Sequence, residues 1–376
     1  MKPGMFKRAS CTPRVLIAAA ILGAGVLAST PCFAGPLIAD GYAFTNFDLP
    51  GSGAIAGAGT TLNGIANNGA VVGFGTADGV NLVNSIRNPD GTATTLNLDS
   101  SAMALGLNSA GDVVGVDPGN GTAFFLPSAG AAQTISIPGG FAPSAFGIND
   151  HGNIVGQYGY QNLTPGFFIQ NAAGNGLITI NAPSGPDIVN AQGVNNNGLV
   201  VGYYTGTDGQ DHGFTANLAL ASGGAITGSA VADPTIPPVP GEPGATFVFS
   251  QILGVNDANI AVGYYGDSTS SQHGFLLNLG TGAYTFLDNP AMQFSNGVES
   301  TQITGINNQG EIAGFYSDAS GVFHGFTACP LVGNGSSCAM QSVPEPGSLA
   351  LACIGLMTLG LGLHGRARAT RTRTAS

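Results

Sequence analysis

The sequence predicts an all-β repeat domain lying between two export segments, and three observations support this prediction. Charged residues make up only 8% of the chain, against about 25% in typical soluble domains. Gly accounts for 61 of the 376 residues, and Gly costs about 1 kcal/mol at each helix-interior position. Six near-copies of one ten-residue phrase run along the middle of the chain. Together these features favour many short strands joined by tight turns.

The phrase has the chemistry of a β-hairpin. In the fourth copy it is Gly193-Val194-Asn195-Asn196-Asn197-Gly198-Leu199-Val200-Val201-Gly202. A strand ends in Gly-Val-Asn, Asn and Gly supply the positive-φ positions of a turn, and a second strand leads away. The closing Gly predicts close packing against neighbouring backbone. In the fifth copy Asn259 takes the turn position of Gly, and Asn is a residue that tolerates positive φ. The copies begin at Gly64, Gly106, Gly147, Gly193, Gly254 and Gly305.

Two further strands follow each hairpin. The third strand carries His-Gly-Phe in the last three copies, at His212, His273 and His324, and a Thr-rich fourth strand comes after it. Four strands in 40–60 residues is the size of a β-propeller blade. We therefore predict a six-bladed β-propeller-like domain over residues 35–330. A Pro-rich insertion at 219–246 accounts for the longest interval and is predicted to be a surface loop.

The predicted ring closes with a strand from the start of the domain. The sixth copy ends at Ala328 without a fourth strand, and an orphan strand of that type lies at Phe44–Pro50. We expect Phe44–Leu49 to complete the last blade, because this would leave no sheet edge open. The repeats resemble the HAF family of extracellular repeats over roughly Ala43–Pro330, with Gly replacing the central Ala in the His-containing copies. The resemblance implies an extracellular domain and names no activity.

The N-terminus has the features of a secretory signal peptide over residues 1–34. Basic residues up to Arg14 precede an apolar run of 13 residues, Val15–Leu27. The run is too short to span a bilayer comfortably as a helix. Small residues before the junction predict cleavage between Ala34 and Gly35.

The C-terminal segment, residues 343–376, predicts a membrane-associated sorting signal. It has the motif Val343-Pro344-Glu345-Pro346, an apolar helix at 349–363, and a tail at 364–376 with Arg366, Arg368, Arg371 and Arg373. A plain membrane anchor is one interpretation, with the Arg tail on the cytoplasmic side. The ordered set resembles the PEP-CTERM signal. That resemblance implies processing by an exosortase-type enzyme, transient anchoring in the inner membrane, and then a place at the cell surface or outside the cell, among biofilm exopolysaccharide.

The charge and cysteine content bear on nucleic-acid binding, disulfide formation and metal binding. From Asp40 to Glu345 there is one basic residue, Arg87, against all 20 acidic residues, a balance of 1 − 20 = −19. Such a surface repels phosphate backbones, so we predict that the protein does not bind nucleic acid. Cys329 and Cys338 are the two cysteines outside the end segments, and Cys338 lies in a linker at 331–342. They predict a local disulfide in an oxidising compartment. With no nearby His, they make an incomplete metal site.

The candidate chemical groups are few. The three repeated histidines could lie on a common ring and hold a metal, but a bond to the backbone of a neighbouring strand, or the capping of a hairpin, is the favoured interpretation. The Asn/Asp turns lack the dense carboxylates of a calcium loop. Glu299 and Glu311 are the only Glu residues outside the insertion and the sorting motif. No catalytic motif is present, so we predict no catalytic residue, metal or cofactor.

Aromatic residues at alternating strand positions separate two hypotheses. We expect them to pack within the blades, although they could also form a sugar-stacking surface: Tyr158, Tyr160, Tyr203, Tyr204, Tyr264, Tyr265, Phe315 and Tyr316. The leading hypothesis is a non-enzymatic structural or interaction protein of the extracellular polysaccharide matrix. The alternative is a propeller that binds or cleaves polysaccharide. Coplanar Tyr side chains with two facing carboxylates at one mouth of the ring would favour the alternative. A mouth of Asn, Gly and Thr would favour the first.

Overall fold

Each ten-residue phrase forms the predicted hairpin in the computed structural model, which describes residues 37–170, 175–184, 188–238, 244–293, 295, 298–332 and 335–336. The turn Gly has positive φ in five copies, for example +78° at Gly198, and Asn259 has φ +58° in the fifth. An Asn side chain tolerates this left-handed conformation better than most other side chains do. The prediction that Asn259 takes the positive-φ position of the turn is therefore confirmed.

The strands group into antiparallel sheets that follow the order of the repeats. Sheet 1 consists of β3 (Gly59–Ile65), β4 (Val71–Thr76), β5 (Leu82–Arg87) and β6 (Ala93–Thr95). Sheet 2 consists of β7 (Met103–Leu107), β8 (Val113–Asp117), β9 (Thr122–Leu126) and β10 (Gln133–Ile135). Sheet 3 consists of β11 (Phe141–Ile148), β12 (Ile154–Gly159), β13 (Gly166–Gln170), β14 (Asn175–Asn181) and β18 (Ala225–Thr227).

The second half repeats this plan. Sheet 4 consists of β15 (Val189–Val194), β16 (Leu199–Thr205), β17 (Asp211–Asn217) and β19 (Ser229–Ala230). Sheet 5 consists of β20 (Phe247–Val255), β21 (Ile260–Asp267), β22 (Gln272–Asn278) and β23 (Ala283–Phe286). Sheet 6 consists of β24 (Thr301–Ile306), β25 (Ile312–Ser317), β26 (Phe323–Val332) and β2 (Tyr42–Phe47), with β1 (Leu37–Ala39) and β27 (Gly335–Ser336) at its margin. The only helix among the described residues is one 3₁₀ turn, η1 (Leu218–Leu220), so the all-β prediction is confirmed.

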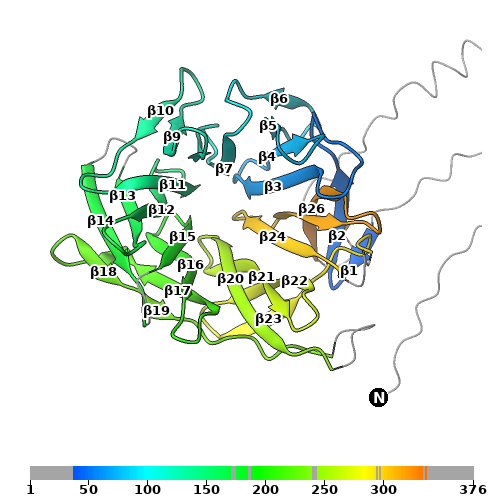
Figure 1. The fold of residues 1–376 in the computed structure, drawn as a ribbon. Helices are drawn as coiled ribbons and strands as arrows, with labels where there is room; N and C mark the ends of the chain where they lie inside the picture. Colours follow the sequence, from blue (N-terminus) through cyan, green and yellow to red (C-terminus); the bar gives the residue numbers. More distant parts are fainter. Residues whose placement is uncertain are drawn as a thin grey trace, which may run out of the picture. The chain divides into compact units, whose positions relative to one another are not determined.

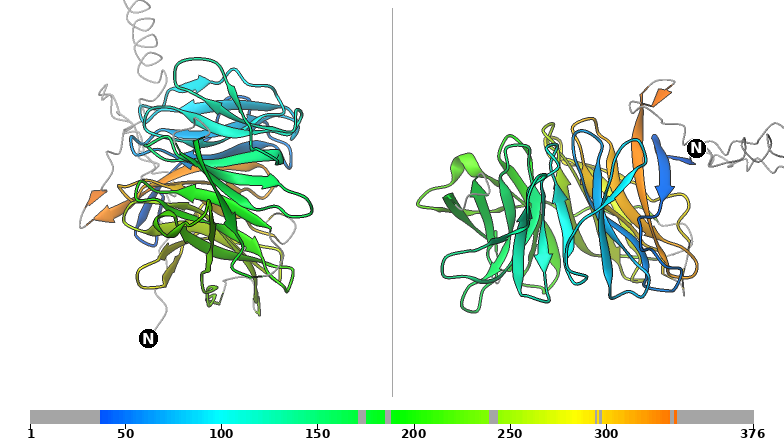
Figure 2. Two further views of the ribbon diagram at one scale, coloured as in Figure 1. Left: turned by 90° about the vertical axis from the view of Figure 1, so that its left-hand side faces the viewer. Right: turned by 90° about the horizontal axis from the view of Figure 1, so that it is seen from above.

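The six sheets are arranged as a ring (Figures 1 and 2). The second strand of each sheet packs against the first strand of the next, from β4 with β7 to β21 with β24, and β25 packs against β3. Sheets 1 and 6 also share one parallel pair, Phe323 with Gly59, which links them into one ten-stranded sheet. The arrangement is propeller-like, with four antiparallel strands in each repeat.

The predicted closing strand is confirmed. Strand β2 pairs antiparallel with β26 from Tyr42 opposite Pro330 to Phe47 opposite Gly325. Phe44 is buried and its ring centroid lies 5.3 Å from that of Phe326. The first and last described segments of the domain are therefore joined within sheet 6.

The apolar core lies between neighbouring sheets. Each of the six clusters of buried residues draws mainly on two adjacent sheets, as Val155 and Ile180 of sheet 3 do with Val200 of sheet 4. The Phe of the third strand is fully buried in four repeats, at Phe167, Phe214, Phe275 and Phe326. Burial of such a side chain contributes about 1.5–3 kcal/mol.

Two glycines of each phrase allow backbone to approach backbone. A Cβ on Gly147, at the start of the third copy, would lie 2.5 Å from the Gln192 carbonyl oxygen in the next sheet. A Cβ on Gly202, at the end of the fourth copy, would overlap the Asn190 carbonyl of its own sheet, beside a bulge in β15. The close packing predicted for the closing Gly is confirmed, and the opening Gly brings the inner strands together.

The prediction of a surface loop at 219–246 is wrong for part of that segment. Strand β18 pairs parallel with β14, and β19 pairs with β17. These short strands cover edges of sheets 3 and 4 that would otherwise expose unpaired N–H and C=O groups.

The predicted export segments lie outside the described residues. The chain divides into two units, Met1–Gly35 and Pro36–Ser376, and only the second contains described residues. Within these, no helix is long and apolar enough to cross a membrane. The signal peptide, its cleavage site, the sorting motif, the helix at 349–363 and the Arg tail therefore stay predictions.

Candidate functional site

A belt of Asn side chains joins the hairpin turns on one face of the ring, which we call its hairpin end. The Asn195 Oδ1 accepts hydrogen bonds from the N–H groups of Asn197 at 3.0 Å and Leu199 at 2.9 Å, which fixes its own turn. Its Nδ2 donates to the Asn256 carbonyl of the next repeat at 3.1 Å. Four other repeats use the same bonds through Asn108, Asn149, Asn256 and Asn307. The first repeat has Ala66 at this position.

The next position of each phrase surrounds the centre of the ring at the same end. In five of the six phrases this residue lines a cavity of about 100 Å³, together with the inner strands. Asp150 accepts from the Ser109 N–H at 2.8 Å and from Asn67 Nδ2 at 2.8 Å. Asp257 accepts from Asn196 N–H at 2.8 Å and from Asn308 Nδ2 at 2.6 Å. The mouth is thus a network of amides and carboxylates that bond to one another.

The Asp150 carboxylate is held in the ionised form. Burial raises the pKa of Asp150, but hydrogen bonds from Ser109 and Asn67 outweigh it and lower the pKa below its usual range. A carboxylate held in this way is a poor general acid at neutral pH, because it does not carry the proton that the role needs. This end of the ring is therefore suited to cohesion between repeats.

The three repeated histidines lie at the opposite ends of the strands, and each is held between carboxylates. The Nδ1 of His212 lies 2.8 Å from Asp233 Oδ2, and its Nε2 lies 3.1 Å from Asp208. The Nδ1 of His324 lies 3.1 Å from Asp48 Oδ1. A Tyr from the preceding strand packs on each ring, with centroids 5.0–5.8 Å apart: Tyr204, Tyr265 and Tyr316. The partners of the histidines are thus carboxylate side chains at the ends of strands, whereas the favoured interpretation had expected a bond to the backbone of a neighbouring strand or a hairpin cap.

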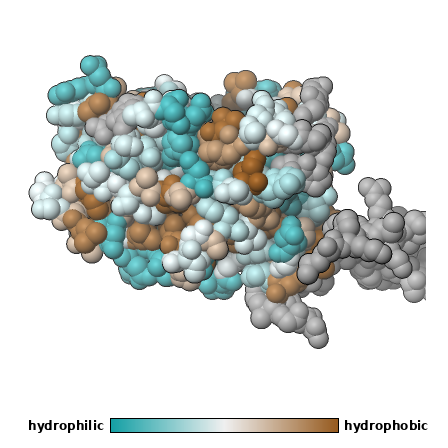
Figure 3. All heavy atoms as spheres, turned by 90° about the horizontal axis from the view of Figure 1, so that it is seen from below, coloured by the Kyte–Doolittle hydropathy of each residue, from teal (hydrophilic) through white to brown (hydrophobic). Residues whose placement is uncertain are grey.

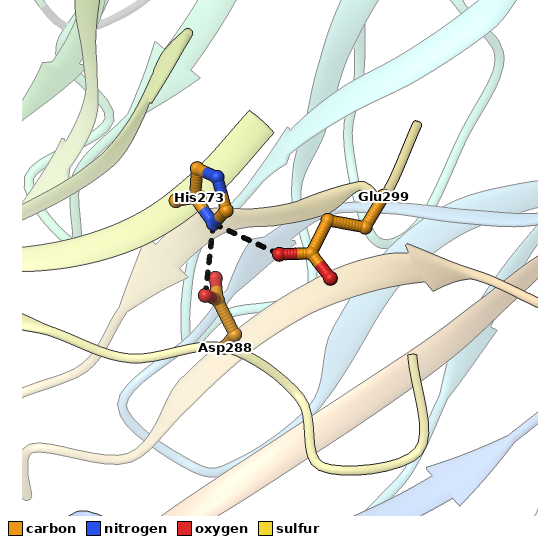
Figure 4. Close-up of side chains that lie close together, drawn as sticks. All are labelled: His273, Asp288 and Glu299. Carbon is orange, nitrogen blue, oxygen red and sulfur yellow. Dashed lines mark hydrogen bonds and ion pairs between the residues drawn. The ribbon is translucent and has the colours of Figure 1, made fainter. Parts of the chain in front are cut away.

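The His273 site, defined as His273, Asp267, Asp288 and Glu299, differs from the other two. Figure 4 shows His273 with Asp288 and Glu299. The Nδ1 atom lies 3.0 Å from Asp288 Oδ2 and also 3.5 Å from Glu299 Oε1. The Nε2 atom lies 3.6 Å from Asp267 Oδ2. His273, Asp267 and Glu299 are buried, whereas the Asp288 side chain is 28% exposed. Three carboxylates thus surround one buried imidazole.

Each residue of this site comes from the end of a different strand. Asp267 ends β21 and His273 lies near the start of β22, so the β21–β22 turn brings both together. Asp288 follows β23, and its Oδ1 accepts from the Gly274 N–H at 3.0 Å. Glu299 precedes β24 of sheet 6 and therefore reaches the site from the neighbouring repeat.

The carboxylates control the ionisation of the imidazole. Burial lowers the pKa of His273, but the hydrogen bond to Asp288 and the charges of Asp288, Glu299 and Asp267 outweigh it and raise the pKa to about 9. The pKa of His212 is also raised: burial lowers it, but the hydrogen bonds and charges of Asp208 and Asp233 outweigh burial. The ring between carboxylates is therefore a site for positive charge.

Sequence reasoning found the histidines but not their partners. In all three repeats a Tyr stands eight residues before the His, as in Tyr265 and His273. An Asp lies in the turn between them, and another follows the fourth strand. This repeated spacing was a usable signal for two of the carboxylates. Glu299 had no such signal, because it occurs in one repeat only.

Two other residues singled out in the sequence, Cys329 and Glu311, make contacts that indicate structural roles. Cys329 is disulfide-bonded, but Cys338 lies outside the described residues, so their pairing stays a prediction. The Glu311 Oε2 accepts from Asn307 Nδ2 at 3.1 Å, and burial raises the pKa of Glu311. Glu311 and Glu299 lie in different networks and do not form one catalytic pair.

Most of the aromatic residues proposed to pack within the blades are buried. Those with little exposure are Tyr158, Tyr204, Tyr264, Tyr265, Phe315 and Tyr316. Tyr160 is 41% exposed. The described residues around the central cavity include no Tyr. On the side of the ring shown in Figure 3, apolar residues are scattered among polar ones.

Comparisons with known proteins give distant structural similarity only. No protein-family model and no curated protein matches the chain. The solved structures that resemble it include an inactive virginiamycin B lyase from Staphylococcus aureus, at 12% identity and a TM-score of 0.41, covering 76% of this chain and 99% of that one. TolB from Acinetobacter baumannii has 12% identity and a TM-score of 0.45, covering 72% and 65%.

The lectin of Aleuria aurantia, in complex with alpha-methyl-L-fucoside, has 12% identity and a TM-score of 0.43, covering 81% of this chain and 99% of the lectin. Similarity at this level assigns no function to the chain.

Proposed function

We propose that this protein is an exported, non-enzymatic structural or interaction protein of the cell surface or extracellular matrix, with extracellular polysaccharide as its partner. Its central domain is a six-bladed β-propeller. Its C-terminal segment is a PEP-CTERM signal processed by an exosortase-type enzyme, after transient anchoring at the inner membrane.

The lining of the central mouth carries this proposal. Besides backbone and apolar side chains of the inner strands, it presents amide side chains and two bonded Asp residues, as in Asn196, Asn308, Asp150 and Asp257. Coplanar Tyr side chains would have favoured a polysaccharide-cleaving site, but Tyr265 and its counterparts pack on histidines inside the sheets. The amide side chains of this mouth also suit contact with hydrated polysaccharide, since such partners offer hydroxyl groups for hydrogen bonding.

Binding and cleavage can be tested in one experiment. The secreted protein is mixed with exopolysaccharide from the producing cells, sedimented, and the supernatant assayed for new reducing ends. We expect the protein to sediment with the polymer and to release no reducing ends. Release of reducing ends would establish cleavage instead, and failure to sediment would remove polysaccharide as the partner.

Processing is tested by replacing Pro344, Glu345 and Pro346 with Ala. Pro keeps this segment extended, because it restricts itself and the residue before it. We expect the variant to accumulate in the membrane fraction, with a Tm equal to that of the wild type. Mass spectrometry of wild-type protein from the medium should find no peptide containing Arg366 to Arg373. Finding that tail on extracellular protein would contradict the sorting signal.

A further inference from the structure

We propose that the His273 site binds a divalent transition-metal ion, with Zn²⁺ as the best fit, through His273 Nδ1, Asp288 and Glu299. This inference goes beyond the proposed function and does not depend on it. It rests on the arrangement of the ligand atoms, on the charge balance of the site, and on the comparison with the sites of the two other repeated histidines, His212 and His324, which we call the sister sites.

The three ligand atoms have the spacing that a metal ion requires. The Nδ1 atom lies 3.0 Å from Asp288 Oδ2 and 3.5 Å from Glu299 Oε1, and all three atoms lie within 4.8 Å of one another. Two ligands at about 2.0–2.2 Å from a tetrahedral Zn²⁺ lie roughly 3.4 Å apart. Small shifts of side chains would therefore complete the coordination.

The third carboxylate, Asp267, supports the opposite side of the histidine ring. Asp267 Oδ2 lies 3.6 Å from Nε2, the ring nitrogen that would not bind the ion. Its other oxygen, Oδ1, accepts from the Thr269 N–H at 2.9 Å and the Ser271 N–H at 3.2 Å, which fixes the carboxylate. A carboxylate behind a metal-binding His holds the ring in the correct tautomer and orientation.

The charge balance favours a divalent ion over a proton. With a protonated His273, three carboxylates leave a formal charge of 1 − 3 = −2 in a largely buried site. A divalent ion with neutral His273 leaves 2 − 3 = −1. Buried charge is costly unless it is compensated. Arg87 is the only Lys or Arg among the described residues, and it lies over the Phe47 ring.

The sister sites lack the second carboxylate at Nδ1. The repeats align through Ile303, Ile252 and Leu62, which oppose the closing Gly of their phrases. In the sister sites Glu299 then corresponds to Val248 and Ala58. There each ring nitrogen has one Asp partner, and the rings are more exposed, at 17% for His212 and 26% for His324. Those two sites therefore lack the Glu ligand of the proposed set.

The ligand set indicates the class of ion. Imidazole nitrogen with carboxylates suits Zn²⁺ and neighbouring transition metals, whereas Ca²⁺ takes six to eight oxygen ligands. The Asp288 side chain is the exposed member of the site. It provides the path by which the ion would enter, and a water molecule could occupy the remaining position.

The test measures binding of Zn²⁺ alone to the untagged full chain after dialysis against EDTA. We expect one ion per chain in the wild type and a rise in Tm of roughly 3–6 °C at an ion concentration of one hundred times Kd. Glu299→Gln should weaken binding at least tenfold. Asp267→Asn should weaken it by about 10–100-fold.

Asp48→Asn is the matched control, because it alters the sister site at His324 and should leave Zn²⁺ binding unchanged. Circular dichroism in EDTA establishes that each variant is folded. If Glu299→Gln does not fold, Asp288→Asn takes its place, since Asp288 is partly exposed. No Zn²⁺ bound to the wild type, or equal binding by wild type and the folded Glu299→Gln or Asp288→Asn variant, would overturn the proposal.

Discussion

The two ends of the ring differ in how strictly the repeats are copied. At the hairpin end, Asn195 and its counterparts make the same bonds to their own turn and to the next repeat in five of six copies. At the histidine end, only three repeats carry the His, and one of them adds a further carboxylate, Glu299. Cohesion is therefore built from what the repeats share, and the candidate site from what one repeat does differently.

The largest expected effect distinguishes the His273 site from its sister at His324. In EDTA, His273→Gln leaves three carboxylates around a neutral amide, so we expect a loss of about 3–5 kcal/mol in unfolding free energy. His324→Gln removes a partly exposed contact between the imidazole and Asp48 and should cost less than about 1 kcal/mol. Urea unfolding at pH 7 gives both values. Equal losses would remove the distinction between the two sites.

A smaller effect is expected at the hairpin end. Asn195→Ala deletes the bonds to Asn197, Leu199 and Asn256, and it leaves their backbone groups without this partner inside the ring. We expect a loss of about 1–3 kcal/mol in unfolding free energy.

The control at that end is Asn197→Ala, which alters an exposed residue of the same turn. Its side chain donates only to the Asp257 carbonyl, at 3.2 Å. Its unfolding free energy should stay within about 0.5 kcal/mol of the wild type. A loss as large as that of Asn195→Ala would contradict the cohesive role of the buried belt.

The smallest effect concerns pH at the third histidine, His212, whose ring faces Asp208 and Asp233 and packs on Tyr204. Its pKa is raised in the folded state. The stabilising contribution is therefore fully present below the ordinary pKa of about 6.5 and is lost as pH rises through the higher folded value.

The Tm difference between wild type and His212→Gln should accordingly be larger at pH 5.5 than at pH 9. Thermal unfolding of both proteins in the same buffers provides the comparison. A difference that grows with pH would show that the ring is stabilised in its neutral form.

Several features followed from the sequence because they are local. The Asn and Gly turns set the hairpins, as Gly198 and Asn259 show with their positive φ. The segment Phe44–Leu49 resembles the fourth strand that the last repeat lacks. This resemblance was sufficient to predict its pairing in sheet 6, since an open edge is costly. The three histidines were visible because His-Gly-Phe recurs at the same place in the last three repeats.

Tertiary structure alone decided what those residues contact. The carboxylate at His324 comes from Asp48, 276 residues earlier, and Glu299 reaches His273 from the next sheet. The short strands β18 and β19 formed inside a segment whose Pro content had predicted a loop. Sequence periodicity reports turns and buried faces, whereas contacts between sheets depend on how the ring brings distant segments together, because hydrogen bonds and charges act through space and not along the chain.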